Sequence, residues 1–121
     1  MLINDFFEIL ETNYSDNKII STIRLNPSHK IYSGHFPDNP VTPGVVQLQI
    51  VKEILENTHK KELRLLSMSR CKFLKILNPN ETPVITITLS YSDNPLHVSA
   101  IGEYQEAIFF KLTALFAYES I

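Results

Sequence analysis

The sequence predicts an α+β fold in which an antiparallel β-sheet wraps around one long central helix. Residues 43–58 carry apolar side chains over a wider arc than a surface helix needs. Four strand-like segments follow with short turns between them, which favours antiparallel pairing. A chain of 121 residues is one domain by length, so we expect residues 1–121 to form a single domain.

Before the central helix, the sequence predicts a short helix, a turn and a strand. The segment Leu2–Leu10 places apolar residues near helical spacing and predicts a helix. The polar segment Asn13–Asn17 predicts a turn. The segment Lys18–Leu25 alternates apolar and polar residues, which predicts a strand that ends at Asn26–Pro27. A long loop is expected over Ser28–Thr42.

The central helix is expected to begin at Pro43, with Thr42 as its N-cap. Threonine can cap a helix, and proline suits the first helical position because its missing N–H has no partner there anyway. Most of the helix surface is apolar, as in a helix that a sheet surrounds. One narrow polar stripe, which is normally a solvated face, carries Gln49, Lys52, Glu53 and Glu56.

The rest of the chain predicts four strands and an oligomer. The expected strands are Leu63–Leu77, Val84–Tyr91, Leu96–Tyr104 and Ala107–Tyr118. The last one has large apolar residues on both faces, whereas an antiparallel strand in an isolated domain usually shows one face to water. We therefore expect a homodimer or a dimer-based oligomer.

Composition excludes several classes of function. A net charge of −2 gives no reason to expect nucleic acid, and no apolar run approaches the length of a membrane span. The single cysteine, Cys71, suits a reducing compartment, and the N-terminus lacks the positive charge of a secretory signal. The spacing of His and Cys residues predicts no metal site. We expect a cytoplasmic protein without a cofactor.

The segment from Ser33 to Gln49 carries the strongest functional signal. It reads Gly34-His35-Phe36-Pro37 and then Pro40-Val41-Thr42-Pro43-Gly44-Val45. His35 stands in a stiff loop nine residues before Gly44, at the start of the expected helix. This spacing places a potential base near a helix N-terminus, which favours negative charge.

These residues resemble the 3-hydroxyacyl-(acyl-carrier-protein) dehydratase family of the hot-dog fold. A looser likeness continues at Cys71–Lys75 and Asn78–Glu81, while the usual N-terminal signature of the family is not found before Asn26. The short N-terminus looks more like the compact dehydratase-like proteins of aryl-polyene pathways. The resemblance implies a substrate carried by an acyl carrier protein, or an acyl-CoA, and active sites formed between two protomers. The pathway would be fatty-acid, polyene or polyketide synthesis.

The resemblance also assigns roles to individual residues. His35 would remove the α-proton, since the pKa of an ordinary histidine lies near working pH. The Gly44 N–H would stabilise the oxyanion on the thioester carbonyl, an interaction worth about 3–4 kcal/mol in related sites. The acyl tunnel would be lined by Tyr32, Phe36, Val45 and Val46.

One position departs from the family. The catalytic acid should stand fourteen residues after His35, where this chain has Gln49. An amide can bind a hydroxyl but cannot readily protonate it. Glu53 follows one helical turn later on the same face, so it is a candidate acid, with Gln49 orienting the substrate. Two alternatives stay open, a hot-dog acyl thioesterase and a catalytically impaired partner subunit that binds acyl chains.

Overall fold

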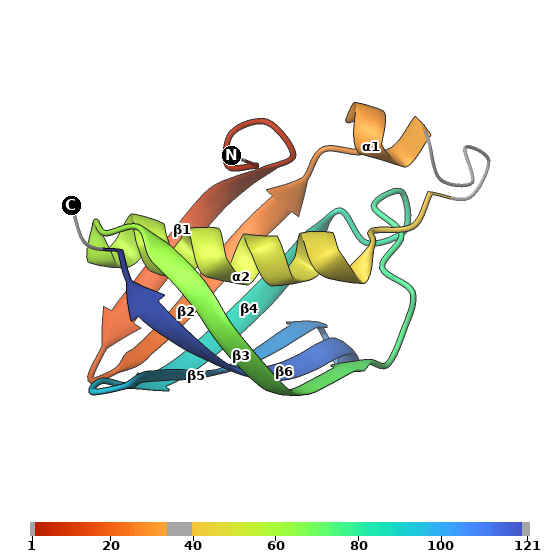
Figure 1. Cartoon of the computed structure of the whole chain (residues 1–121). Coiled ribbons are helices and arrows are strands. Elements are labelled where there is room, and N and C mark those ends of the chain that lie inside the picture. Colours follow the sequence, from red (N-terminus) through yellow and green to blue (C-terminus); the bar gives the residue numbers. More distant parts are fainter. Residues whose placement is uncertain (1, 34–39, 120–121) are drawn as a thin grey trace.

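The computed structural model describes residues 2–33 and 40–119, which form a curved antiparallel sheet around a long helix (Figure 1). Within this part of the chain, six strands pair in the order β1-β2-β4-β5-β6-β3. The strands are β1 (Phe7–Ser15), β2 (Lys18–Leu25), β3 (Leu63–Phe73), β4 (Val84–Ser92), β5 (Leu96–Tyr104) and β6 (Ala107–Tyr118). The helices are α1 (Lys30–Ser33) and the central α2 (Gly44–His59).

The N-terminal segment differs from the expectation, and the predicted helix over Leu2–Leu10 is wrong. The Leu2 carbonyl accepts hydrogen bonds from the N–H groups of Asp5 and Phe6, at 3.0 and 2.7 Å, so one tight turn forms. The backbone then pairs with β2 as strand β1. The two strands are joined at Asp16–Asn17, where both residues have positive φ, as in a tight hairpin. Pairing with β2 satisfies the backbone of this segment and overrides its local helical periodicity.

The predictions for β2, β5 and β6 are confirmed with their exact bounds, and β4 extends one residue beyond the prediction. The regular alternation of apolar and polar residues predicted these four strands, because in each strand one set of side chains is buried in the core. The segment expected as a strand over Leu63–Leu77 keeps strand geometry only to Phe73. Its residues are mostly exposed and therefore show no clear alternation.

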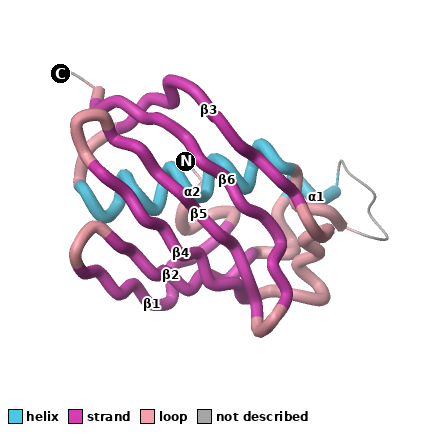
Figure 2. Tube along the Cα trace, turned by 90° about the horizontal axis from the view of Figure 1, so that it is seen from below, coloured by secondary structure: helices cyan, strands magenta, loops and turns pink. Residues whose placement is uncertain are grey.

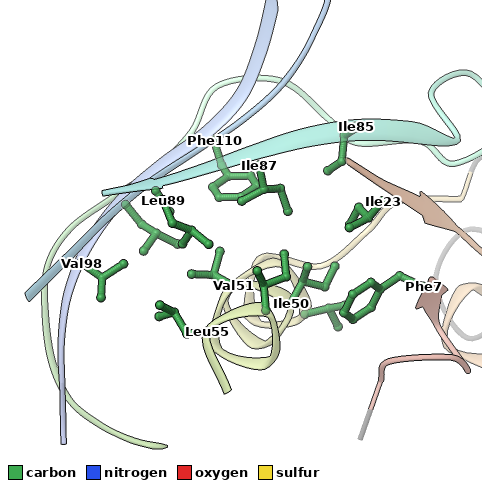
Figure 3. Packing of buried hydrophobic residues seen from close by; sticks show 14 of the residues in the cluster. Phe7, Ile23, Ile50, Val51, Leu55, Ile85, Ile87, Leu89, Val98 and Phe110 are labelled. Carbon is green, nitrogen blue, oxygen red and sulfur yellow. The ribbon is translucent and has the colours of Figure 1, made fainter. Parts of the chain in front are cut away.

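Helix α2 lies in the concave face of the sheet and supplies the centre of the core. Ile50, Val51 and Leu55 are at most 1% exposed. Figure 3 shows them facing core residues of the strands, including Ile87 and Leu89. Burying each such side chain stabilises the fold by roughly 1.5–3 kcal/mol, so this helix cannot leave the sheet without unfolding the protein.

The C-terminal end of α2 is closed by side-chain contacts. Lys60 ends the helix in the left-handed conformation, with φ of 56°. Tyr118 donates a hydrogen bond to Asp93 at 2.9 Å, so the His59 Nδ1–H at 3.3 Å donates to the Tyr118 oxygen. Burial lowers the pKa of His59, against the attraction of Asp93. Burial also raises the pKa of Tyr118 to about 12, and the hydrogen bond to Asp93 adds to this.

Strands β1 and β3 lie at opposite edges of the sheet (Figure 2). Strand β3 exposes large apolar side chains, with Leu65, Leu66 and Met68 38%, 48% and 41% exposed. On the neighbouring strand β6, Phe110 and Phe116 are buried, whereas the other face is half-buried apart from the buried Phe109 and the exposed Lys111. The two apolar faces expected for this strand are thus one core face and one partly exposed face.

Candidate active site

The N-terminal end of α2 begins without a side-chain cap. Pro43 is the N-cap residue, with φ of −60° and ψ of 149°, and the helix starts at Gly44, one residue later than expected. The N–H groups of Val46 and Gln47 both donate to the Pro43 carbonyl at 3.1 Å. No described residue accepts a hydrogen bond from the Gly44 N–H. A free donor at this end of the helix dipole favours an anionic or partly negative ligand atom.

Thr42 does not cap the helix, which corrects the expectation for its hydroxyl. That hydroxyl instead shares a buried hydrogen bond of 2.8 Å with the Tyr32 hydroxyl. The Thr42 N–H donates to the Leu77 carbonyl at 2.9 Å. Gln47 Nε2 donates to the Thr42 carbonyl at 3.0 Å. Thr42 is therefore fixed through its hydroxyl, its N–H and its carbonyl, directly before the helix start.

Tyr32 fixes the other side of the motif loop. Its ring stacks on Phe6 with 5.1 Å between ring centroids. Burial raises the pKa of Tyr32 to about 12, although the hydrogen bond with Thr42 acts in the opposite direction. The hydroxyl therefore stays neutral at physiological pH. The Tyr32–Thr42 hydrogen bond joins the two flanks of the histidine motif, while His35 and Phe36 themselves lie outside the described residues.

Gly44 is in close contact with the end of β3. A methyl group added at Gly44 would lie 2.5 Å from the ring of Phe73. The absence of a side chain at Gly44 therefore has a packing reason. Phe73 is 48% exposed, so its ring forms part of the surface beside the helix start.

The described tunnel candidates lie in three different environments. Tyr32 is 3% exposed and borders a small hollow of about 190 Å³ together with Pro40. Val46 is 9% exposed and packs in the core. Val45 is 74% exposed and faces outward. The described residues do not bring these three side chains together around one cavity.

Gln49 and Glu53 lie in contact, as their spacing on the helix predicts. Gln49 Nε2 donates to Glu53 Oε2 at 2.8 Å. Glu53 was expected on a solvated stripe, but it is only 1% exposed. Its Oε1 accepts from the N–H groups of Leu2 and Ile3 at 2.9 and 2.8 Å, and Oε2 also lies 2.9 Å from the Leu2 nitrogen. The carboxylate thus ties the N-terminal segment to the middle of α2.

Gln49 also borders an open groove of about 560 Å³ that is lined by α2, by the segment leading into β3 and by Glu119. Charged side chains of both signs, lysines and glutamates, line the groove. Its lining residues are Gln49, Lys52, Glu56, Asn57, Lys60, Lys61, Glu62, Leu63 and Glu119. Gln49 is half-buried, so one side of its amide contacts Glu53 while the residue still reaches the groove.

Sequence reasoning missed the role of Gln47. This residue is 4% exposed, and its Nε2 holds the Thr42 carbonyl at the base of the motif loop. Its Oε1 is buried and has no hydrogen-bond partner among the described residues. The available signal was a glutamine within the apolar arc of α2, next to Val46. A polar residue in that position normally has a specific hydrogen bond to make.

His29 has a structural environment. It is 8% exposed, and its Nδ1 accepts the Ile31 N–H at 3.1 Å. The Nε2–H therefore donates to Asp5 Oδ2 at 3.0 Å. Over residues 2–33 and 40–119, no group of three or more His, Cys, Asp or Glu side chains is arranged to hold a metal ion. In the same ranges, no helix has the length and apolar character needed to cross a membrane.

Comparison with curated proteins finds 3-hydroxyacyl-[acyl-carrier-protein] dehydratases. The chain is 27% identical over 107 residues to the 3-hydroxyacyl-[acyl-carrier-protein] dehydratase FabZ of Rickettsia typhi, covering 81% of this chain and 65% of that enzyme. It is 32% identical over 82 residues to FabZ of Rickettsia bellii, covering 60% and 57%. The chain thus spans less than two thirds of the length of these relatives.

Comparison with solved structures supports the hot-dog fold. The dehydratase heterocomplex ApeI:P from Xenorhabdus doucetiae matches with a TM-score of 0.71 and 16% identity, covering 90% of this chain and 96% of the matched chain. An uncharacterised protein from Erwinia carotovora subsp. atroseptica matches with a TM-score of 0.66 and 17% identity, covering 91% and 92%. The family model of the ApeI dehydratase, called ApeI-like, matches residues 11–109. The chain therefore belongs to the ApeI-like dehydratase family and has the hot-dog fold.

Proposed function

We propose that this protein acts on 3-hydroxyacyl thioesters carried by an acyl carrier protein, removing water to give trans-2-enoyl thioesters. The observation that carries the proposal is the family match over residues 11–109, which includes the histidine motif and the uncapped helix start. The FabZ relatives are dehydratases of acyl-carrier-protein substrates by name. An acyl-CoA is the simpler form of the same thioester and is the second substrate to test.

The chemistry requires a base, an oxyanion donor and a proton for the departing hydroxyl. We assign the base to His35 and the oxyanion donor to the Gly44 N–H. The free Gly44 N–H supports this assignment, because the helix dipole adds to its attraction for developing negative charge. The Tyr32–Thr42 hydrogen bond supports it as well, since it holds both flanks of the motif loop against the helix start.

The direct test is interconversion of a 3-hydroxyacyl-carrier substrate and its trans-2-enoyl product, followed by mass spectrometry. Conversion by the protein that is lost in His35→Ala supports the proposal. Release of free acid without enoyl product would point to thioester hydrolysis and overturn it. Deuterium exchange at the α-carbon, measured in the same reactions, reports whether His35 removes that proton.

The source of the proton for the hydroxyl is the open part of the mechanism. We retain Glu53 as a candidate acid, one helical turn after Gln49. The distance from Gln49 Nε2 to Glu53 Oε2 is 2.8 Å. In its described contacts, the carboxylate of Glu53 accepts hydrogen bonds and donates none. Glu53→Gln keeps the size of the side chain and removes the acid, so unchanged turnover in this variant would exclude the role.

A catalytically impaired partner subunit is the second candidate function. The observation that favours it is the engagement of Glu53 by the backbone of Leu2 and Ile3, beside an amide at the usual position of the acid. Such a subunit would bind acyl carrier protein and supply His35, while another chain supplies the acid. Gln49→Glu tests this by placing a carboxylate at the family position. Activity that appears only in this variant would favour the partner subunit.

We propose that the working form is a dimer. Strand β3 exposes Leu65, Leu66 and Met68, and the outer face of β6 is half-buried and partly apolar. A second copy covering this surface would remove apolar area from water. Sedimentation of the purified chain should give twice the mass of 13.9 kDa. A monomer that dimerises only with another hot-dog chain would instead indicate a heterodimer.

A further inference from the structure

We infer that Glu53 fixes the polarity of the Gln49 amide, so that the site takes a hydrogen-bond donor at C3 and discriminates against a C3 ketone. The inference rests on the proposed function and adds a specificity to it. The ligands concerned are 3-hydroxyacyl thioesters, which should bind, and 3-oxoacyl thioesters, which should bind more weakly. Gln49 would touch the substrate. Glu53 would be a positioning residue rather than the acid, because both of its oxygens accept hydrogen bonds.

The Glu53 carboxylate is buried and held by backbone donors. Glu53 is 1% exposed, and the backbone N–H groups of Leu2 and Ile3 hold it at 2.9 and 2.8 Å. Backbone N–H groups can only donate, so these contacts require acceptor oxygens on Glu53. The two donors belong to a turn that is closed by its own hydrogen bonds to the Leu2 carbonyl. Glu53 is therefore oriented by the backbone and does not depend on Gln49 for its position.

The carboxylate in turn orients the amide. Gln49 Nε2 lies 2.8 Å from Glu53 Oε2, a short distance that suits an N–H donor and a charged acceptor. The reversed amide would bring two oxygens together, which loses the hydrogen bond and adds repulsion. With Nε2 held in this way, Oε1 lies on the other branch of the amide, away from Glu53. Gln49 is half-buried beside the open groove, so this oxygen is the amide atom left for a ligand.

The two ligand classes differ in what they can offer to this oxygen. A hydroxyl at C3 can donate its hydrogen to Gln49 Oε1, but a ketone at C3 has only acceptor lone pairs. A ketone placed there would leave both oxygens without a partner and would lose the hydrogen bonds that each makes to water. Such a mismatch costs enough to weaken binding about tenfold or more.

The test measures binding, so it does not depend on turnover. The probes are non-hydrolysable pantetheine amides that carry a 3-hydroxybutyryl or a 3-oxobutyryl group, titrated by calorimetry or NMR. The wild-type protein should bind the 3-hydroxy ligand about tenfold more tightly or better. Gln49→Ala should bring the two affinities close to equality, because the acceptor is gone.

Glu53→Gln is the decisive variant. It keeps one acceptor oxygen for the N-terminal N–H groups and places an amide opposite Gln49, which can then turn either way. The preference for the 3-hydroxy ligand should fall to within about threefold, mainly through tighter binding of the 3-oxo ligand. A purely structural role would weaken both ligands together and leave their ratio unchanged. Glu56→Gln is the matched control, because Glu56 borders the same groove and accepts the Leu63 N–H instead, at 2.8 Å.

Three results would overturn the inference, each in a distinguishable way. Equal affinity of the wild-type protein for both ligands would exclude the selectivity and leave the proposed function standing. Absence of binding of either ligand would remove the selectivity and the proposed function together. A wild-type preference that persists unchanged in Glu53→Gln would show that Glu53 does not orient the amide.

Discussion

The two ends of α2 are built in opposite ways. At the C-terminal end, His59, Tyr118 and Asp93 form a connected set of hydrogen bonds, and Lys60 supplies a left-handed cap. At the N-terminal end, no side chain caps the helix, and the Gly44 N–H has no partner among the described residues. Closed helix ends stabilise a fold, whereas an open end costs stability and leaves donors for a ligand. The difference fits the proposal that the N-terminal end belongs to the active site and that the C-terminal end is structural.

The sharpest test of this comparison replaces one histidine near each end of α2 by alanine. His35→Ala removes the proposed base and should lower kcat/KM about 10²- to 10⁴-fold while leaving the melting temperature near the wild-type value. His59→Ala should lower the melting temperature and leave kcat/KM within about threefold, because its contacts are structural. Dehydration assays and thermal melts of both variants give the comparison. Loss of activity in His59→Ala without loss of stability would contradict it.

The next largest effect is expected at Glu53, between the two ends. Glu53→Ala removes the acceptor of the Leu2 and Ile3 N–H groups and of Gln49, and should cost about 2–3 kcal/mol of unfolding free energy. Urea unfolding followed by circular dichroism measures the loss. Glu53→Gln should lose less, since it keeps one acceptor oxygen. Equal losses in the two variants would mean that the charge, rather than the acceptor geometry, holds the N-terminal segment.

A smaller effect separates packing from chemistry at Gly44. Gly44→Ala should destabilise the protein by about 1 kcal/mol, because the new methyl group would lie 2.5 Å from Phe73 unless the ring moves. In a Phe73→Ala background the same change should be neutral or stabilising, because alanine favours helix over glycine. Both variants keep the residue 44 N–H. A double-mutant cycle compares the unfolding free energies of the wild type, Gly44→Ala, Phe73→Ala and the double variant. Additive changes in unfolding free energy would exclude the contact between residues 44 and 73.

The smallest expected effect is a pH dependence from the closed end. Burial lowers the pKa of His59 in the folded protein below its ordinary value of 6.5. The unfolded chain therefore takes up a proton first as the pH falls, so the contribution of His59 is complete above about pH 6.5 and is lost below it. The melting temperature should fall less between pH 7 and pH 5 in His59→Asn than in the wild-type protein. Identical pH profiles would contradict this.

Side-chain patterns predicted most of the fold and less of the site. The bounds of strand β5 were predicted correctly. One face of this strand is buried and the other is not, and this difference is encoded in the alternation of its residues. Helix α2 was predicted to within one residue at each end. The segment Leu2–Leu10 failed because the hydrogen bonds of β1 to β2 are backbone interactions, which leave little mark on the sequence.

The same reason explains what was missed around Gln49. The sequence predicted that Gln49 and Glu53 share a helix face, since helical spacing is a local property, and the structure adds the hydrogen bond between them. It did not predict that Glu53 is buried, because the groups that cover it are backbone N–H groups about fifty residues away. The hydroxyl of Thr42 was expected to cap α2, but Tyr32 competes for it through a contact across the motif loop. Non-local backbone contacts and competition for one hydroxyl are not visible in side-chain spacing.

The two edges of the sheet differ in how readily they would pair with another copy of the chain. Strand β3 offers an apolar, strand-shaped edge, and pairing of two copies through it would consume that edge in both. The remaining outer strand, β1, carries Glu8 and Glu11 and a bulge between Ile9 and Glu11, features that discourage further strand addition. A sheet with both edges open to strand pairing could add further copies at each end. If two copies of this chain pair through β3, strand addition would end there, because both remaining edges would be β1 strands.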